Sequence, residues 1–362
     1  MDPAGSLASW LRLTLIPGLG GESQRTLLKA FGLPEAIFAA SRSALSAATS
    51  NRAADLILGT DNRQAVERAL AWAEEPDRHI LTLADPGYPQ SLLQIPDPPT
   101  LIHVRGRVEL LNTPALAVVG SRNPTPQGMK NAEHFASAFA EAGLTVTSGL
   151  ALGIDAAAHR GALRVSGNTL AFIGTGIDRV YPAANHALAS EIATRGAIVS
   201  ELPLGTPPVA ANFPRRNRLI AGFTSGTLIV EATVQSGSLI TARLASEQGR
   251  DVFAVPGSIH SPQSRGCHRL IREGAKLVET VEDVLEELHW PGTRVATATL
   301  PDAPEESDTL LRNMGFDPCG LDELATRTGL KADVVAVMLL QLELAGAVAS
   351  LPGGRYQRLS PA

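Results

Sequence analysis

Small polar residues and one arginine follow several apolar runs of the chain, at the points where each run gives way to a helix-like segment. Turns of this kind offer backbone N–H groups, hydroxyls and a guanidinium, which are groups that bind phosphate and other anions. The sequence therefore predicts a row of anion-binding turns. Their candidate residues are Ser121, Arg122, Ser148, Gly149, Gly237 and Ser238.

A cluster of arginines lies between these turns. The segment NFPRRNRLIAG holds Arg215, Arg216 and Arg218, with Phe213 ahead of them and Asn217 among them. Several phosphate-sized sites in a row suit a polymer better than a single nucleotide, and Phe213 can stack on an unpaired base. Because aromatic residues are only 4% of the chain, stacking cannot extend along many bases. We expect phosphates in helix-terminal pockets and one or a few bases in small recesses.

The motifs of common enzyme classes are absent. The first predicted strand-to-helix turn lacks G-x-G-x-x-G, and neither a P-loop nor a G-x-S-x-G elbow occurs. Asp155 and His159 are four residues apart on one face of one predicted helix. No motif supplies a nucleophile beside them, so the pair alone does not predict a hydrolase. The sequence shows no metal-ligand spacing. It therefore predicts a binding protein with no catalytic, cofactor or metal site.

Composition further limits the number of domains and the kinds of ligand that the protein can bind. The 362 residues, 44% of them hydrophobic, are enough for two or three domains with buried cores. A formal net charge of -5 excludes an indiscriminate polyanion binder, so a nucleic-acid site must be a local basic patch. Cys267 and Cys319 are far apart and are expected to be reduced thiols. No run has the length of a membrane helix, so we expect a soluble cytoplasmic protein.

The N-terminal part of the chain, residues 1–75, is predicted to form a small helical domain. Its segment IPGLGGESQRTLLKAFG is typical of a glycine turn followed by an amphipathic helix. Helix-hairpin-helix or SAM-like modules have this form, and there the turn donates N–H groups to a DNA phosphate. A tight turn between two packed helices is the other interpretation, and only Arg25 and Lys29 add charge nearby.

From residue 115, apolar runs of five to seven residues alternate with segments of helical spacing. Such near-continuous runs predict parallel strands covered on both faces, that is, a doubly wound, Rossmann-like α/β domain. We place this domain at residues 76–289. The runs are ALAVVG, LTVTSG, TLAFIGTG, AIVSEL, TLIVEA and DVFAVPG.

The C-terminal part predicts a second small domain. Residues 290–306 are rich in proline, threonine and alanine and are predicted to be a linker. In residues 307–362, two helices at 321–328 and 331–345 precede a hairpin around Gly353-Gly354, which is the outline of a winged helix. The second helix has few charges, which favours contact with protein over reading of duplex DNA.

The segments over about residues 80–280 resemble the DprA family, also called Smf or DNA-processing protein A, in the family's own order. Their joint match is specific, and the flanking regions fit the family's plan more loosely. The matching segments are DPGYPQSLLQIPDPPTLIHVRG, AVVGSRNPTPQG, SGLALGIDAAAHRGAL, IGTGIDRVYPAANHAL, SELPLGTPPVAANFPRRNRLIAG, EATVQSGSLITARLASEQGRDVFAVPG and GCHRLIREGAKLV.

The resemblance implies a protein that binds single-stranded DNA entering a cell in natural transformation. Family members protect this DNA, help to load the recombinase RecA onto it, and displace or work with single-strand-binding protein. They form homodimers through the Rossmann-like domain, and no catalysis is established for them. The resemblance implies that Arg122 pairs with a phosphate, that Phe213 and Asn217 lie near a base, and that Glu231 orders the pocket. The other implied contacts are Ser121, Ser148, Gly149, Arg215, Arg218, Gly237 and Ser238.

The chain lacks some positively charged residues that other members of the family carry. Lysines that some members carry after YP and before FPxRNR are absent, and His268 stands where asparagine is usual. Phosphate neutralisation is therefore expected to depend more on Arg122 and the three clustered arginines.

An enzyme of another class stays open as an alternative. Nucleoside monophosphate phosphoribohydrolases of the LOG type use a P-G-G-x-G-T-x-x-E loop on a related sheet. Here FTSGTLIVEA keeps Gly226, Thr227 and Glu231, but Pro-Gly-Gly is absent and the spacing to the glutamate is one residue longer.

Overall fold

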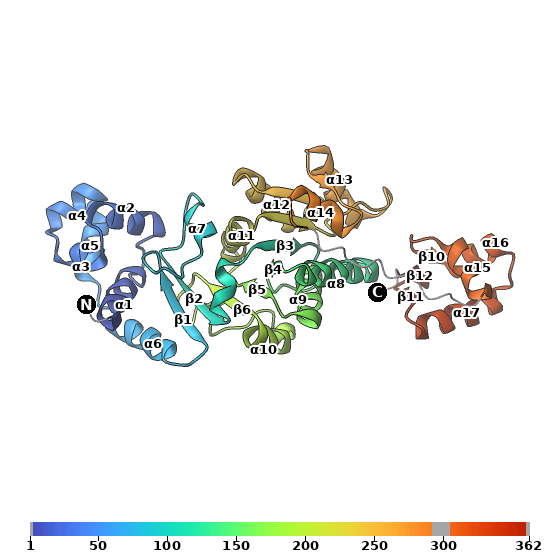
Figure 1. The fold of residues 1–362 in the computed structure, drawn as a ribbon, viewed down its shortest axis with the longest axis horizontal. Helices are drawn as coiled ribbons and strands as arrows, with labels where there is room; N and C mark the ends of the chain where they lie inside the picture. The colour runs from blue at the N-terminus through green and yellow to red at the C-terminus, as the bar shows by residue number, and fades with distance from the viewer. Residues whose placement is uncertain (1–2, 292–304, 360–362) are drawn as a thin grey trace.

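The computed structural model describes residues 3–291 and 305–359. Figure 1 shows a central α/β domain that lies between a group of N-terminal helices and a small C-terminal domain. Most of the predicted linker, residues 292–304, lies outside the described residues. In the described part of the chain, no helix combines the length and the apolar composition needed to cross a membrane.

The N-terminal helices pack around an apolar core of their own. Leu13, Leu27, Ile37 and Leu45 are fully buried in it, because each lies on the inner face of a short amphipathic helix. The helices are α1 (Pro3–Thr14), α2 (Gly21–Phe31), α3 (Pro34–Ala39), α4 (Arg42–Ala48), α5 (Asn51–Gly59) and α6 (Arg63–Ala73).

The glycine turn between α1 and α2 is packed against the central domain. Gly18 has a φ of +81°, a left-handed conformation that favours glycine. Leu19 is buried, and Gly20 lines a cavity of about 170 Å³ that also touches His103 of the central sheet. This is the geometry of a tight turn between packed elements, and a role of the turn in DNA binding stays a prediction.

The central domain is built on one nine-stranded sheet in the order β1-β2-β6-β5-β4-β3-β7-β8-β9. The strands from β6 to β9 in this order are parallel, which confirms the predicted doubly wound, Rossmann-like arrangement. Their bounds are β1 Arg78–Thr82, β2 Leu101–Gly106, β3 Ala115–Val119, β4 Thr145–Ser148, β5 Thr169–Phe172, β6 Ala197–Ser200, β7 Gly226–Ile229, β8 Asp251–Ala254 and β9 Lys276–Leu277.

One edge of the sheet differs from the all-parallel expectation. β2 pairs antiparallel with β6, and β1 pairs antiparallel with β2. The apolar run of β2 indicates a strand, but its direction depends on a partner almost a hundred residues away. β1 has the burial pattern of a half-exposed strand and lacks a continuous apolar run.

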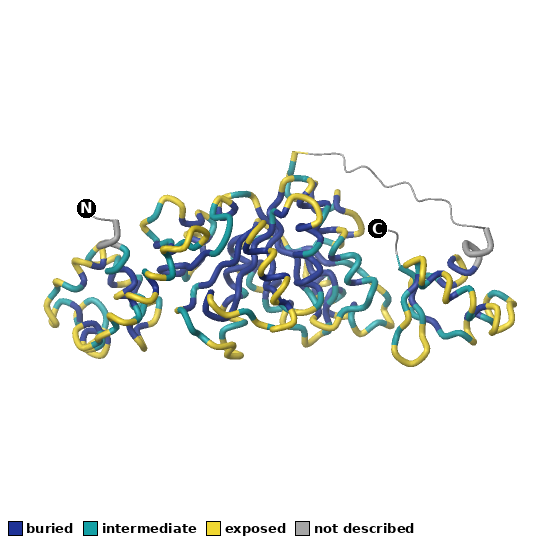
Figure 2. The backbone as a smooth tube through the Cα atoms, turned by 90° about the horizontal axis from the view of Figure 1, so that it is seen from below, coloured by how far each residue is buried: buried dark blue, intermediate teal, exposed yellow. Residues whose placement is uncertain are grey.

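Helices cover both faces of the sheet because successive side chains of a strand point to opposite sides. Along β3, Ala117 and Val119 pack with α7, α11, α12 and α13, whereas Leu116 and Val118 pack with α8, α9 and α14. The residues of β3 to β7 are all buried, and the middle of the central domain is dark blue in Figure 2. The helices are α7 (Gln90–Leu93), α8 (Pro126–Glu141), α9 (Ile154–Val165), α10 (His186–Arg195), α11 (Asn212–Phe223), α12 (Ser238–Glu247), α13 (Arg265–Arg272) and α14 (Val281–Glu287).

The C-terminal domain is a winged helix, as predicted. α16 (Leu321–Thr328) and α17 (Ala332–Leu344) are followed by the hairpin of β11 (Val348–Leu351) and β12 (Arg355–Arg358). β10 (Cys319–Gly320) completes the small sheet, and α15 (Glu305–Met314) precedes it. The sequence interpretation missed α15.

Candidate functional site

Most of the polar turns noted in the sequence lie together at the carboxyl ends of the parallel strands. β4, β5 and β6 lie on one side of β3, whereas β7 and β8 lie on the other. Open α/β sheets bind ligands at such a reversal of strand order. A cavity of about 590 Å³ lies there, which we call the strand-end cavity. It is lined by the loops after β3, β4, β5, β6 and β7, by one face of α11, by the start of α12 and by Gln263.

Arg122 is the exposed cation of the strand-end cavity. Among the described residues, no acidic side chain forms an ion pair with it, and its guanidinium carbon lies over the Phe213 ring, 6.0 Å from the centroid. The backbone before it is fixed, since the Ser121 N–H donates to the Glu231 carbonyl at 2.7 Å. The Ser121 hydroxyl in turn accepts from the N–H of Asn123 at 3.1 Å. The turn is therefore held in place while its guanidinium is available to an anion.

Glu231 holds the other end of this loop. Its two carboxylate oxygens accept from the Thr125 N–H at 2.9 Å and from the Thr125 hydroxyl at 2.6 Å. Thr125 caps α8 by accepting from the Gly128 N–H at 3.0 Å, and a Cβ on Gly128 would lie 2.4 Å from the Glu231 carboxyl carbon. Burial raises the pKa of Glu231, and the Thr125 bonds oppose this. Glu231 thus orders the loop, with both oxygens already engaged.

Arg216 is a buried charge in the wall of the strand-end cavity, only 4% exposed. Its guanidinium donates to the Gly149 carbonyl at 2.6 Å and to the Phe172 carbonyl. Burial lowers the pKa of Arg216 to about 10, against the field of Asp155, so it stays charged at neutral pH. A Cβ on Gly149 would lie 2.4 Å from this guanidinium, so the position needs glycine. Arg216 therefore joins the ends of β4 and β5 and adds positive potential to the cavity.

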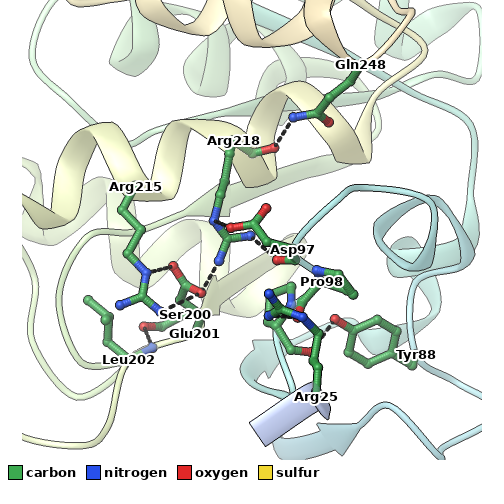
Figure 3. A network of polar contacts seen from close by, with 11 residues as sticks. Arg25, Tyr88, Asp97, Pro98, Ser200, Glu201, Leu202, Arg215, Arg218 and Gln248 are labelled. Atoms are coloured by element: carbon green, nitrogen blue, oxygen red, sulfur yellow. Dashed lines mark hydrogen bonds and ion pairs between the residues drawn. The ribbon is translucent and has the colours of Figure 1, made fainter. Parts of the chain in front are cut away.

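Arg215 and Arg218 lie on a different face of α11 from Arg216 and do not line the strand-end cavity. Figure 3 shows both guanidiniums directed at Glu201, at the end of β6. Arg215 Nε lies 3.1 Å from Glu201 Oε1, and Arg218 pairs with Oε2. Arg218 Nε also lies 3.0 Å from an Asp97 carboxylate oxygen. Burial raises the pKa of Glu201, while the two guanidiniums oppose this.

The eleven residues predicted from the sequence thus divide by position. Ser148, like Arg215 and Arg218, is not in the lining, and its hydroxyl donates to the Val118 carbonyl at 2.7 Å. Gly149 lies behind the lining, against Arg216. Those that line the cavity are Ser121, Arg122, Phe213, Arg216, Asn217, Gly237 and Ser238.

Sequence reasoning missed several residues of the cavity lining, and the aromatic one among them is Tyr181. It lies in the loop after β5, with its ring centroid 5.5 Å from that of Phe213. The signal that could have found it is a tyrosine in a strand-end loop, in the segment IGTGIDRVYPAANHAL. Across residues 3–291 and 305–359, no three histidine, cysteine or acidic side chains gather as metal ligands would.

The model of the family described as DNA recombination-mediator protein A matches residues 79–289, more than half of the chain. The chain belongs to this family. A second model, described as the DprA winged helix domain, matches residues 294–354.

Three known proteins illustrate how similar this chain is to others. Protein Smf of Escherichia coli K12 is 43% identical over 315 residues, which cover 82% of each chain. The X-ray structure of DprA from Streptococcus pneumoniae has a TM-score of 0.68 at 37% identity, over 76% of this chain and 95% of that one. The DNA processing protein A of Helicobacter pylori, described for its single-stranded DNA binding mode, has a TM-score of 0.53 at 30% identity, over 58% of this chain and 96% of that one.

Proposed function

We propose that this chain binds single-stranded DNA at the strand-end cavity. The observation that carries the proposal is the exposed Arg122 guanidinium, free of acidic partners among the described residues and placed over the Phe213 ring, in a cavity that Tyr181 also lines. A cation next to stacking surfaces suits a phosphate joined to an unpaired base. Membership of a recombination-mediator family, and a relative described for binding single-stranded DNA, support this ligand.

The wider role follows from the family resemblance. The chain would protect incoming single-stranded DNA in the cytoplasm and load RecA onto it during natural transformation or recombination. It would displace or work with single-strand-binding protein, act as a homodimer through the Rossmann-like domain, and carry out no catalysis itself.

The residues at the site would divide into two groups. Direct contacts to DNA would come from residues that line the strand-end cavity with reachable polar atoms, a charge or a ring. The remaining predicted residues would support them from behind. The direct contacts are Ser121, Arg122, Phe213, Asn217, Gly237 and Ser238, and the supporting residues are Ser148, Gly149, Arg215, Arg216 and Arg218.

Arg122→Ala tests the proposal. Loss of one charge-assisted contact to phosphate should weaken binding of a single-stranded oligonucleotide by about 10- to 100-fold. It should also reduce the slope of log affinity against log salt by about 0.7, because one phosphate is no longer neutralised. Fluorescence anisotropy with single-stranded and duplex oligonucleotides of equal length, over a salt series, measures both.

Arg195→Ala is the matched control. Arg195 ends α10 just before β6 begins, at the opposite edge of the sheet, and pairs there with Glu191. Its removal changes the net charge as Arg122→Ala does but should leave affinity unchanged. Equal binding of single strands and duplexes, or wild-type affinity in Arg122→Ala, would mean that the cavity has another ligand.

A further inference from the structure

Two aromatic residues line the strand-end cavity, and they differ in how much ring they present. Tyr181 is 48% exposed, whereas Phe213 is only partly exposed. Their rings are tilted by 44° with centroids 5.5 Å apart, so they contact each other without stacking in parallel. A base that enters the cavity therefore meets the Tyr181 ring as the more open of the two.

The Phe213 ring is already surrounded by protein. Along one edge it abuts Gly174, where a Cβ would lie 2.9 Å from a ring carbon. The Arg122 guanidinium lies over the ring and Tyr181 lies beside it. These contacts fix Phe213 at the start of α11 and leave less of its ring for a ligand.

We infer that Tyr181 is the residue on which an unpaired base stacks, and that Phe213, besides the smaller contact that it can itself make with DNA, supports the Tyr181 ring. The inference rests on the proposed function and deepens it, because it assigns the base contact to a residue that the sequence did not suggest. Arg122, whose guanidinium lies over the Phe213 ring, would hold a neighbouring phosphate of the same strand. A duplex cannot present a base face in this way, so the contact would favour single strands.

Tyr181→Ala should weaken binding of a thymidine oligonucleotide by about 5- to 150-fold, which is the range for loss of one stacked base. Tyr181→Phe is the matched control and should bind within about twofold of wild type, since the ring provides the stacking surface. An oligonucleotide with abasic residues has no bases to stack, so it distinguishes a stacking role of Tyr181 from a role in supporting the loop. Wild type should prefer the thymidine oligonucleotide to the abasic one, and Tyr181→Ala should lose that preference.

Three results would overturn the inference. Wild-type affinity in Tyr181→Ala, with wild type still binding single strands, rejects Tyr181 as the stacking residue and leaves the proposed function standing. An equal loss of affinity for thymidine and abasic oligonucleotides would show that Tyr181 only supports the loop. If wild type binds no single-stranded DNA at all, the proposed function and the inference fail together. Circular dichroism of each variant verifies that the fold is intact before binding is compared.

Discussion

Replacement of Glu201 by glutamine is expected to lower the hydrogen-exchange protection of α11 by roughly 100-fold, equivalent to about 3 kcal/mol. The Glu201 side chain is 5% exposed and lies between Arg215 and Arg218. Without its charge, Arg218, whose side chain is only 10% exposed, keeps Asp97 alone as an acidic partner, and that side chain is 46% exposed. Removing the buried partner of a buried charge is among the most destabilising changes available to a protein. Exchange of a peptide that covers Asn212–Phe223 measures the effect.

The control for this prediction is an ion pair on the surface. Asp55 pairs with Arg42 at 2.7 Å, but both side chains are more than half exposed. Exposed pairs contribute little because water screens them and ordering the side chains costs entropy. Asp55→Asn should therefore leave protection at its wild-type level in both α5 and α11. Unchanged protection of α11 in Glu201→Gln would show that Glu201 does not hold this helix.

His103→Phe is expected to raise the free energy of unfolding at acidic pH. His103 is 2% exposed on β2, and burial lowers its pKa to about 4. Below pH 6.5 the unfolded chain therefore takes up a proton that the folded chain refuses, so stability falls as the pH falls from 6.5 towards 4. At pH 5 the loss is about 2 kcal/mol for this one group. The phenyl ring removes this loss and can keep the edge contact with Trp72, whose ring centroid lies 5.7 Å away.

Unfolding midpoints in urea at pH 7.5 and pH 5.0 test this prediction. Wild type and His103→Phe should be similar at pH 7.5, and the variant should be the more stable at pH 5.0. His159 keeps part of the acid sensitivity in both proteins, because burial and then the charge of Arg216 lower its pKa to about 3. His260→Gln, at an exposed position, should behave as wild type at both pH values. The same pH dependence in wild type and His103→Phe would contradict the assignment.

The strands of the central sheet could be predicted because burial on both faces demands continuous apolar runs. Val118 and Val119 point to opposite faces of β3, and both are covered. The antiparallel edge could not be predicted, because no local feature of the β1 or β2 sequence indicates which strand each one pairs with. The prediction of a winged helix succeeded for a related reason: α16, α17 and the hairpin each have a local signature.

The division of the arginines on α11 depends on helix rotation. Arg215 and Arg218 are three residues apart and share one face with Glu201 as partner, whereas Phe213, Arg216 and Asn217 belong to the cavity. Helical spacing alone separates these two sets, so this part could have been predicted. Which face meets the cavity could not, because it depends on how α11 packs on the sheet. The open ring of Tyr181 likewise becomes visible only in three dimensions.

The antiparallel edge of the sheet has a consequence for the order of events during synthesis. His103 of β2 pairs with Ser200 of β6, so β2 leaves the ribosome long before its partner exists. At about 5–20 residues per second, the intervening chain takes roughly 5–20 s to make. Throughout that time the residues from His103 to Gly106 lack the strand with which they pair, and Val104 among them is fully buried in the folded protein. The nascent chain thus exposes an unpaired strand edge with apolar side chains. This makes the β2 segment a natural binding site for a chaperone.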